Sequence, residues 1–509
     1  MKRRFLLAAP WCAAVLTLAA TAAGAASESD TAVTIYSSAQ PGAIPAELYR
    51  PLPGEAGPSA QAVPGYALVR VDRDVRVAAG RSTLRFGDVA ALIDPTTVTF
   101  TVPEDPGTRV LEQNFQFDLV SSAKLLQRYV DRPITVERST GDKLATVSGT
   151  LLSAADGGLV LREADGTVTA LRSYTAVRFP DLPGGLITQP TLLWELSATS
   201  AGTKRARVSY QTGGITWWAD YNLTYNEARG PGDGTLDLAA WVSVINQSGA
   251  SYEDARLKLI AGEVNRVPAP QAGIERRAVM AMRAAEAEAG FAEKAFDEFH
   301  LYTLGRRTTL PNNSTKQIEL FERARRVPAK RLLTYSGFAA PLFGSPYTER
   351  DPGVAPNTRV DAWLEFRNDA KSGLGVPLPA GRVRVSRLDP ADGSLEFIGE
   401  DAIAHTPKDE TVRLRIGAAF DVVGERRQSD FHVDSQARWM EEAIEIRLRN
   451  HKPVPVEVQV REPLYRWSNW KVVDASQAYV QDSARQLHFD VAVPADGESV
   501  VRYRVRYSW

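Results

Sequence analysis

Hydrophobic and polar residues alternate along much of this chain, most clearly between Ile215 and Leu259. Within segment 215–225 the apolar residues share one parity, and the other parity is mostly polar. A two-residue period of this kind predicts a β-strand with one buried face. The period recurs over 236–244 and 255–259, and glycine-containing turns separate the three runs. We therefore predict a β-meander at the centre of the fold.

The last third of the chain alternates in the same way. Apolar residues fall on one parity in six further runs, and the opposite parity is largely Arg, Glu and Asp. Strands with one dry and one wet face are typical of antiparallel sandwiches. A loop rich in proline and glycine, 337–356, interrupts the alternation, so the pattern fits one sandwich or two that divide near 337–358.

The amino-terminal third shows shorter elements. Segment 31–64 is rich in Pro, Ala, Gly and Ser and is interpreted as an irregular lead-in, followed from Tyr66 by short strands that form a small β domain ending near Leu119. A brief helical connector is expected over 121–130. Five short strands between Ile134 and Phe179, joined by Asp-Gly and Gly-Gly turns, predict a small SH3-like barrel that acts as a structural spacer.

One segment is predicted to be helical. Between Glu275 and Phe299 the composition turns to Ala, Glu, Arg and Met, and Phe291, Ala295 and Phe299 are spaced four residues apart. This spacing is typical of an amphipathic helix. We predict a helical insertion between strands over 272–300, with Gly290 weakening it by about 1 kcal/mol relative to alanine.

The predicted fold class is thus all-β: multidomain antiparallel β-sandwiches with a small SH3-like barrel and one helical insertion. The expected order is a signal peptide (1–25), a proline-rich lead-in with a small β domain (26–119), the barrel (120–182) and the sandwich region (183–509). A chain of 509 residues is too long for one core, which supports a division into several domains.

The first residues have the pattern of a secretory leader. Lys2, Arg3 and Arg4 precede an apolar run that ends in small residues at Ala23-Gly24-Ala25, and the only cysteine, Cys12, lies inside it. We expect cleavage, and a periplasmic or extracellular location in which a large domain needs no disulfide. No later run is long enough for a transmembrane helix, and a net charge of −1 offers no basic excess for nucleic acid.

Several motifs, taken together, support a family resemblance. They are Ile215-Thr-Trp217-Trp218-Ala-Asp-Tyr221, Val244-Ile-Asn246-Gln-Ser-Gly249, Lys316-Gln-Ile318-Glu-Leu320, Pro377-Leu-Pro379-Ala-Gly381, Gly399-Glu400-Asp401 and Ile416-Gly417-Ala-Ala-Phe420-Asp421. The chain carrying them resembles the bacterial domain of unknown function 4139 (DUF4139) family over most of 186–509. The resemblance implies an exported β-sandwich protein and supplies no activity or catalytic residue.

Residues for catalysis do not form a recognisable motif. The sequence contains no nucleophile elbow, zinc-protease helix, P-loop, dinucleotide fingerprint or EF-hand, and its five histidines are scattered. We therefore assign no catalytic residue, cofactor or metal. One cluster of acids with an imidazole is Glu400, Asp401, His405, Asp409 and Glu410, which we interpret as a turn followed by a strand rather than as an acid–base site.

A second cluster and one aromatic residue are the candidates for a ligand or partner surface. The cluster runs from Asp421 to Asp434 and includes Arg426, Arg427 and His432; a solvated hairpin tip is its simpler interpretation. Trp217 and Trp218 point to opposite faces of one strand, so one lies in the core. The other is either exposed for stacking or covered by a neighbouring loop.

The sequence favours a non-catalytic binding or structural module of the cell envelope, with sandwich edges and loops presenting its surface to an unidentified envelope protein or polymer. One alternative is a periplasmic hydrolase acting on envelope polymers through His405 or His432. The other is an outer-membrane β-barrel, prompted by the shared parity of Val501, Tyr503, Val505, Tyr507 and Trp509.

Overall fold

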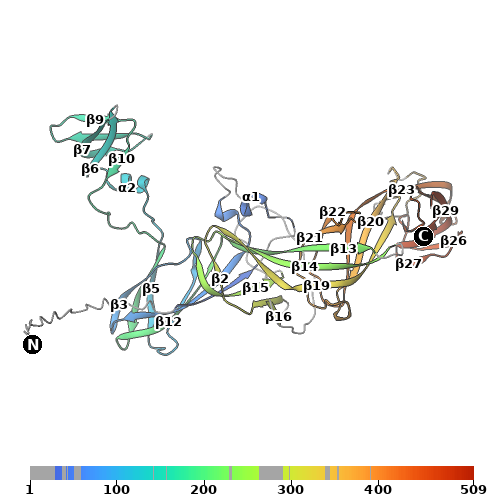
Figure 1. The fold of residues 1–509 in the computed structure, drawn as a ribbon, viewed down its shortest axis with the longest axis horizontal. Coiled ribbons are helices and arrows are strands. Elements are labelled where there is room, and N and C mark those ends of the chain that lie inside the picture. Colours follow the sequence, from blue (N-terminus) through green and yellow to red (C-terminus); the bar gives the residue numbers. More distant parts are fainter. Residues whose placement is uncertain are drawn as a thin grey trace, which may run out of the picture.

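A computed structural model describes residues 29–36, 42, 44–50, 59–140, 143–155, 157–227, 232–262, 291–296, 299–338, 344–351, 355–389 and 391–509. The predicted signal peptide lies outside these residues. The structure is 64% strand and 4% helix in several sheets, which confirms the all-β sandwich prediction. Figure 1 shows an elongated body with a small sheet held away from it.

The largest sheet forms the long axis of the body. Within the described residues it has 13 strands, ten of them in the order β22-β21-β13-β14-β19-β20-β23-β24-β29-β26, and β25, β28 and β27 branch from β19. The bounds of these strands are β13 Ile215–Glu227, β14 Asp233–Asn246, β19 Ser314–Tyr335, β20 Arg359–Arg367, β21 Gly381–Leu388, β22 Leu395–Ile403, β23 Thr411–Asp434, β24 Trp439–Asn450, β25 Val456–Pro463, β26 Trp470–Ala475, β27 Val480–Ser483, β28 Gln486–Val493 and β29 Gly497–Ser508.

The predicted meander lies at the centre of this sheet. Ile215 pairs with Asn246 and Glu227 with Gly234, so β13 and β14 form one long antiparallel ladder. The apolar parity of β13 is buried, as its two-residue period predicts, with Trp217 and Tyr221 2% and 0% exposed.

Two smaller sheets cover the first half of the body. In the described part of the chain, one has eight strands, seven in the order β16-β17-β15-β1-β2-β12-β4 with β18 beside β15, and the other has the order β3-β11-β5. Their bounds are β1 Asp30–Tyr36, β2 Tyr66–Val77, β3 Gly80–Phe86, β4 Ile93–Thr101, β5 Arg109–Gln116, β11 Thr191–Ala198, β12 Gly202–Thr212, β15 Tyr252–Ala261, β16 Phe291–Phe296, β17 Phe299–Leu304 and β18 Thr308–Leu310.

The amino-terminal β domain predicted to end near Leu119 is wrong as a separate unit. Residues of β1 to β4 share one continuous hydrophobic core with β11 to β15 and the first half of the large sheet. The predicted irregular lead-in is also corrected, because it contains β1, which lies between β2 and β15, and the short helices α1 (Ala46–Tyr49) and η1 (Ala60–Ala62). The Pro-, Ala-, Gly- and Ser-rich composition of the lead-in led to the interpretation of β1 as irregular. Its partner β15 lies more than 200 residues later in the sequence.

A second core fills the other end of the body. It is built from the ends of β19 and β23 with β24, β25, β28 and β29, and includes Tyr335, Phe489 and Tyr503. β19 and β23 run through both cores. Along one edge, β19 pairs with β14 as far as Lys330 and with β25 from Leu333 onward. The large sheet therefore forks at this point.

The small sheet contains the five strands predicted for the barrel. They are β6 Pro133–Thr140, β7 Lys143–Ser153, β8 Leu159–Glu163, β9 Val168–Leu171 and β10 Ala176–Arg178, in the order β10-β6-β7-β8-β9. No pairing between β9 and β10 occurs in the described residues, so the sheet stays open rather than closing into a barrel. The predicted connector is confirmed as α2 (Ser122–Arg128), whose first turn is capped by Ser121.

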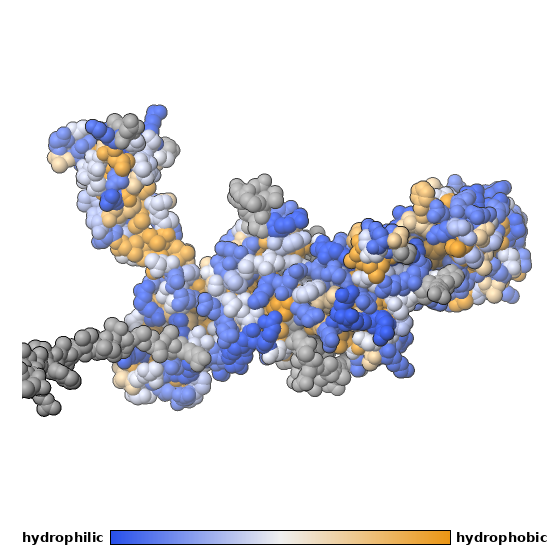
Figure 2. Space-filling view, viewed as in Figure 1, coloured by the Kyte–Doolittle hydropathy of each residue, from blue (hydrophilic) through white to orange (hydrophobic). Residues whose placement is uncertain are grey.

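A stem made of two segments of the chain joins this sheet to the body (Figure 1). Leu119 and Ile187 form a parallel β-bridge within it. Apolar residues gather along the stem (Figure 2), where Phe117 and Leu182 are 69% and 50% exposed.

The predicted helical insertion is wrong where the structure describes it. Residues 263–290 lie outside the described part, but 291–296 and 299–304 form β16 and β17, and β17 pairs with β15. A spacing of four residues is also an even number. A four-residue spacing therefore fits a strand as well as a helix. Here Phe291 and Phe299 belong to two strands that pair as a hairpin, and β17 pairs with the edge of β15.

No helix in the described ranges is long and apolar enough to cross a membrane.

Candidate functional site

Trp218 is covered by the amino-terminal segment. Its indole is 8% exposed, packs with Leu48 and lies 5.6 Å from the Tyr49 ring, so of the two predicted arrangements the structure shows the covered one. Its Nε1 donates to Asp220 Oδ2 at 2.6 Å. Trp217, on the opposite face, is 2% exposed and donates to the carbonyl of Ile260.

Asp220 is the centre of a buried polar cluster beneath this cover. Ser243 Oγ donates to the same carboxylate at 3.1 Å, and Arg382 Nη2 lies 3.4 Å from its other oxygen. Asp220 is 5% exposed. A carboxylate so enclosed and hydrogen-bonded orients its neighbours, and this cluster therefore has a structural role.

The first acidic cluster does not converge on its histidine. Glu400 lies 3.2 Å from Arg384 Nε, Asp401 accepts a hydrogen bond from the backbone N–H of Arg415 at 2.6 Å, and His405 Nδ1 accepts one from the backbone N–H of Ala380 at 3.1 Å. The predicted turn over 399–401 is wrong, because these residues belong to β22. Asp401 instead joins β22 to β23 where no ladder forms between them.

The second cluster is not a hairpin tip. Residues 421–434 belong to β23, and the turn follows at 435–438. Strand alternation separates Arg426, which is 9% exposed, from Arg427, which points to solvent. His432 has the same parity as Arg426 but is exposed, because a β-bulge between Gln428 and Asp430 shifts the register. The His432 ring lies 5.2 Å from the Trp439 ring across the β23–β24 ladder.

Arg426 belongs to a buried ion pair that was not predicted. Its Nε donates to Glu462 Oε2 at 2.9 Å, and the Tyr503 hydroxyl donates to the same oxygen at 2.6 Å. Glu462 is 0% exposed. Burial, together with the nearby Glu462 carboxylate, raises the pKa of Tyr503 well above its usual value, so the hydroxyl stays protonated as a donor.

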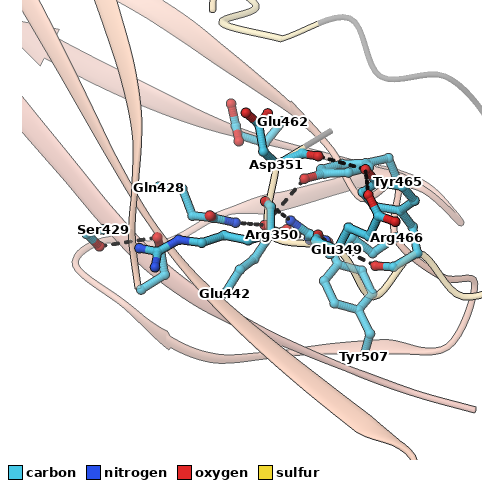
Figure 3. Close-up of polar contacts among 12 residues, drawn as sticks. Glu349, Arg350, Asp351, Gln428, Ser429, Glu442, Glu462, Tyr465, Arg466 and Tyr507 are labelled. Carbon is cyan, nitrogen blue, oxygen red and sulfur yellow. Dashed lines mark hydrogen bonds and ion pairs between the residues drawn. The ribbon is translucent and has the colours of Figure 1, made fainter. Parts of the chain in front are cut away.

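A second buried ion pair lies beside the first (Figure 3). Arg466 Nε donates to Glu442 Oε2 at 2.9 Å, and Gln428 and Tyr507 also donate to this carboxylate, at 3.0 and 3.2 Å. Arg466 is 0% and Glu442 1% exposed. The sequence held a signal for Glu442, which occupies the buried parity of β24 between Met440 and Ile444.

Arg466 also fixes a loop. Its guanidinium donates to the backbone carbonyls of Tyr347, Glu349 and Arg350 at 3.0, 2.6 and 3.1 Å, so one side chain holds segment 344–351 against the second core (Figure 3). The charges of Arg466 and Glu442 are enclosed and hydrogen-bonded, whereas Arg426 Nη2 and Glu462 Oε1 are buried without a hydrogen-bond partner in the described structure. We therefore regard this network as an organiser of the second sandwich, not as a site of chemistry.

An open groove lies at the other end of the body, between two sheet edges. It has a volume of about 550 Å³, and its residues come from β4, β5 and their connection. Val98, Phe100 and Val110 give it an apolar floor that is continuous with the first core. Pockets of roughly 300–1,000 Å³ are usual for ligands.

Both walls of this groove are edge strands. In the described residues β4 pairs only with β12, and β5 only with β11, so each presents one unpaired backbone edge. Gln113 spans one end: its Nε2 donates to the carbonyl of Pro95 at 2.8 Å, and its Oε1 accepts from Trp194 Nε1 at 2.8 Å. Lys204 forms an ion pair with Asp105 in the β4–β5 connection, which fixes the other end. We call this feature the edge groove.

Sequence reasoning placed the partner surface at sandwich edges and loops but did not locate this groove. Its walls come from strands whose pairing partners are β12 and β11, about 100 residues away in the sequence. Among the described residues, no three His, Cys, Asp or Glu side chains are grouped closely enough to hold a metal ion. Comparisons of the chain with protein-family models, curated proteins and solved structures find no match.

Proposed function

We propose that the chain is an exported, non-catalytic binding module of the cell envelope, and that the edge groove is its partner site. The partner is an extended polypeptide segment with alternating apolar residues, which adds as a strand between β4 and β5. Export and membership of the 4139 family belong to the same proposal, and neither adds a catalytic residue to it.

The observation that carries the proposal is that two unpaired strand edges, of β4 and β5, border a groove with an apolar floor. Unpaired N–H and C=O groups on a sheet edge are templates for another strand. In strand addition the main-chain hydrogen bonds supply affinity, and alternate side chains enter pockets. At the edge groove, Val98, Phe100 and Val110 offer contacts to one face of such a strand, and its other face remains in water.

The separation of the acid–base candidates also favours binding over catalysis. Glu400, Asp401 and His405 each make a different structural contact, and His432 lies beside Trp439 with the two rings tilted. General acid–base catalysis needs such groups within hydrogen-bond reach of one substrate atom.

A synthetic peptide of about nine alternating valine and threonine residues, ended by lysine, tests the proposal. We expect saturable binding, measured by fluorescence anisotropy, and at least tenfold weaker binding of a peptide in which central threonines are replaced by proline, which lacks the backbone donor.

Two neighbouring residues of β5 provide a matched pair of variants. Val110 lines the groove, whereas Leu111 is absent from its lining and is 36% exposed. Val110→Lys is expected to abolish peptide binding and Leu111→Lys to leave it unchanged. Equal affinity of both variants, in protein that remains folded by circular dichroism, would reject the edge groove as the site.

A further inference from the structure

A second pocket lies where the large sheet forks. It has a volume of about 460 Å³ and is bordered by β19, the start of β14 and the loop that leads into β25. Its apolar wall is formed by Leu332, Val454 and Val456, and Arg331 and Lys452 line its polar wall. We call it the fork pocket.

Cations gather at one end of the polar wall, around Arg331 and Lys452, although the lining as a whole has balanced charge. Its basic residues are Lys330, Arg331, Arg413 and Lys452, and its acidic residues are Glu227, Glu365, Glu457 and Asp490. The carboxylate of Glu227 already binds Arg387 Nη2 at 2.7 Å and lies 3.9 Å from Arg331 Nη1. The Nε of Arg331 is buried without a hydrogen-bond partner in the described structure. Arg331, Arg387 and Lys452 therefore lie around Glu227, and Asp421 is a second carboxylate near Lys452.

Of the three other acids in the lining, Glu457 forms no ion pair within the described residues, and the other two have partners of their own. Glu365 forms an ion pair with Arg413, and Asp490 is held by Gln459 at 3.4 Å. Within the described residues, Lys452 Nζ makes neither a hydrogen bond nor an ion pair.

The buried side chain of Asn450 holds the loop that carries Lys452 in place. Asn450, 1% exposed, donates through Nδ2 to the carbonyls of Val454 and Pro494, both at 2.9 Å, and its Oδ1 accepts from the backbone N–H of Lys452 at 3.0 Å. The backbone that carries Lys452 is therefore fixed before any ligand arrives, which lowers the entropy cost of binding.

The electrostatics of Lys452 agree with this geometry. Burial lowers the pKa of its ammonium, and the nearby Arg331 guanidinium lowers that pKa further, against the opposite effects of Asp421 and Glu227. A cation destabilised in this way gains from an added anion.

We propose that the fork pocket binds an oxyanion, a carboxylate or a phosphate monoester, that is carried on an apolar group. The oxyanion lies between Arg331 and Lys452, and the apolar group packs on Leu332, Val454 and Val456. This site is separate from the edge groove and does not depend on the function proposed for it.

Isothermal titration with four probes tests this assignment: octanoate, octyl phosphate, inorganic phosphate and octanol. We expect octanoate or octyl phosphate to bind, inorganic phosphate to bind more weakly, and octanol not to bind. The stronger of the two amphiphiles identifies the headgroup. Octanol binding as tightly as the anions, or no binding of either amphiphile, would overturn the proposal.

The variant Lys452→Gln shortens the side chain by one atom, keeps it polar and removes its charge. We expect it to lower the affinity for the more tightly bound amphiphile by about tenfold or more, as the loss of one charge-assisted contact implies. Lys471→Gln, an exposed lysine on β26, is the matched control and should bind normally. Unchanged affinity of Lys452→Gln, with an unaltered thermal midpoint, would exclude this lysine and contradict the assignment.

Discussion

The guanidinium of Arg466 donates to the carboxylate of Glu442 at 2.9 Å in the interior of the second sandwich, where the two residues are 0% and 1% exposed. Such a pair must be desolvated on folding, so its net contribution to stability is small even when its geometry is good. Its role is to specify structure. It holds segment 344–351, which follows the end of β19, against strands β23, β24 and β29.

Removing one partner of this pair is expected to be costly. Arg466→Met leaves Glu442 as a buried carboxylate without its cation, and we expect the free energy of unfolding to fall by about 3–5 kcal/mol. Urea unfolding followed by tryptophan fluorescence measures this loss.

The double variant Arg466→Met with Glu442→Leu separates the charge from the packing. Because both charges are gone, most of the lost stability should return, whereas backbone amides in 344–351 should still exchange faster than in the native protein. A double variant as unstable as Arg466→Met would show that the pair contributes more than conformational specificity.

Asn246 and Asn450 end β14 and β24 with the same contacts. Each donates through Nδ2 to the carbonyl four residues later and accepts from the backbone N–H two residues later. Replacing either by alanine leaves buried carbonyls unpaired, and we expect a loss of about 1–3 kcal/mol for each. Asn114→Ala, on an exposed position of β5, is the control and should change stability by less than about 0.5 kcal/mol in the same denaturation assay.

Stability should depend on pH through Asp72. Arg207 donates to both of its carboxylate oxygens at 2.9 Å, and these hydrogen bonds hold the pKa of Asp72 below its usual value. The contribution is therefore present above the unfolded pKa of about 4 and is lost as the pH falls through the folded pKa. The stability difference between native protein and Asp72→Asn should shrink as the pH is lowered from about 6 toward 2. A difference that stays constant over this range would contradict the role of this ion pair.

Local periodicity predicted much of the fold because it reports which face of a strand is buried. β13 and β14 follow from it, and so does the opposite orientation of Arg426 and Arg427 once residues 421–434 are known to be a strand. It failed between Phe291 and Phe299, where a four-residue spacing predicted one helix but the residues belong to two paired strands, β16 and β17. Pairing with β15 decided the outcome there.

The sites depend on features that one stretch of sequence does not contain. The sequence places Glu442 among the apolar, buried positions of β24, which marks it as unusual. Its partner Arg466 lies beyond β25, so no local pattern connects the two residues. The edge groove exists because β4 and β5 lack a second neighbour, and the fork pocket exists because β19 exchanges one partner for another. Both depend on strand order, and hydrophobic alternation does not encode strand order.

Amide hydrogen exchange in the presence of the alternating valine–threonine peptide tests the partner site most directly. Strand addition forms main-chain hydrogen bonds, so the account requires slower exchange in β4 (Ile93–Thr101) and β5 (Arg109–Gln116), and little change in the distant edge strand β26. Protection of both edges at a saturating peptide concentration is the expected result. Peptide binding without protection of either edge, or with equal protection of β26, would contradict the account.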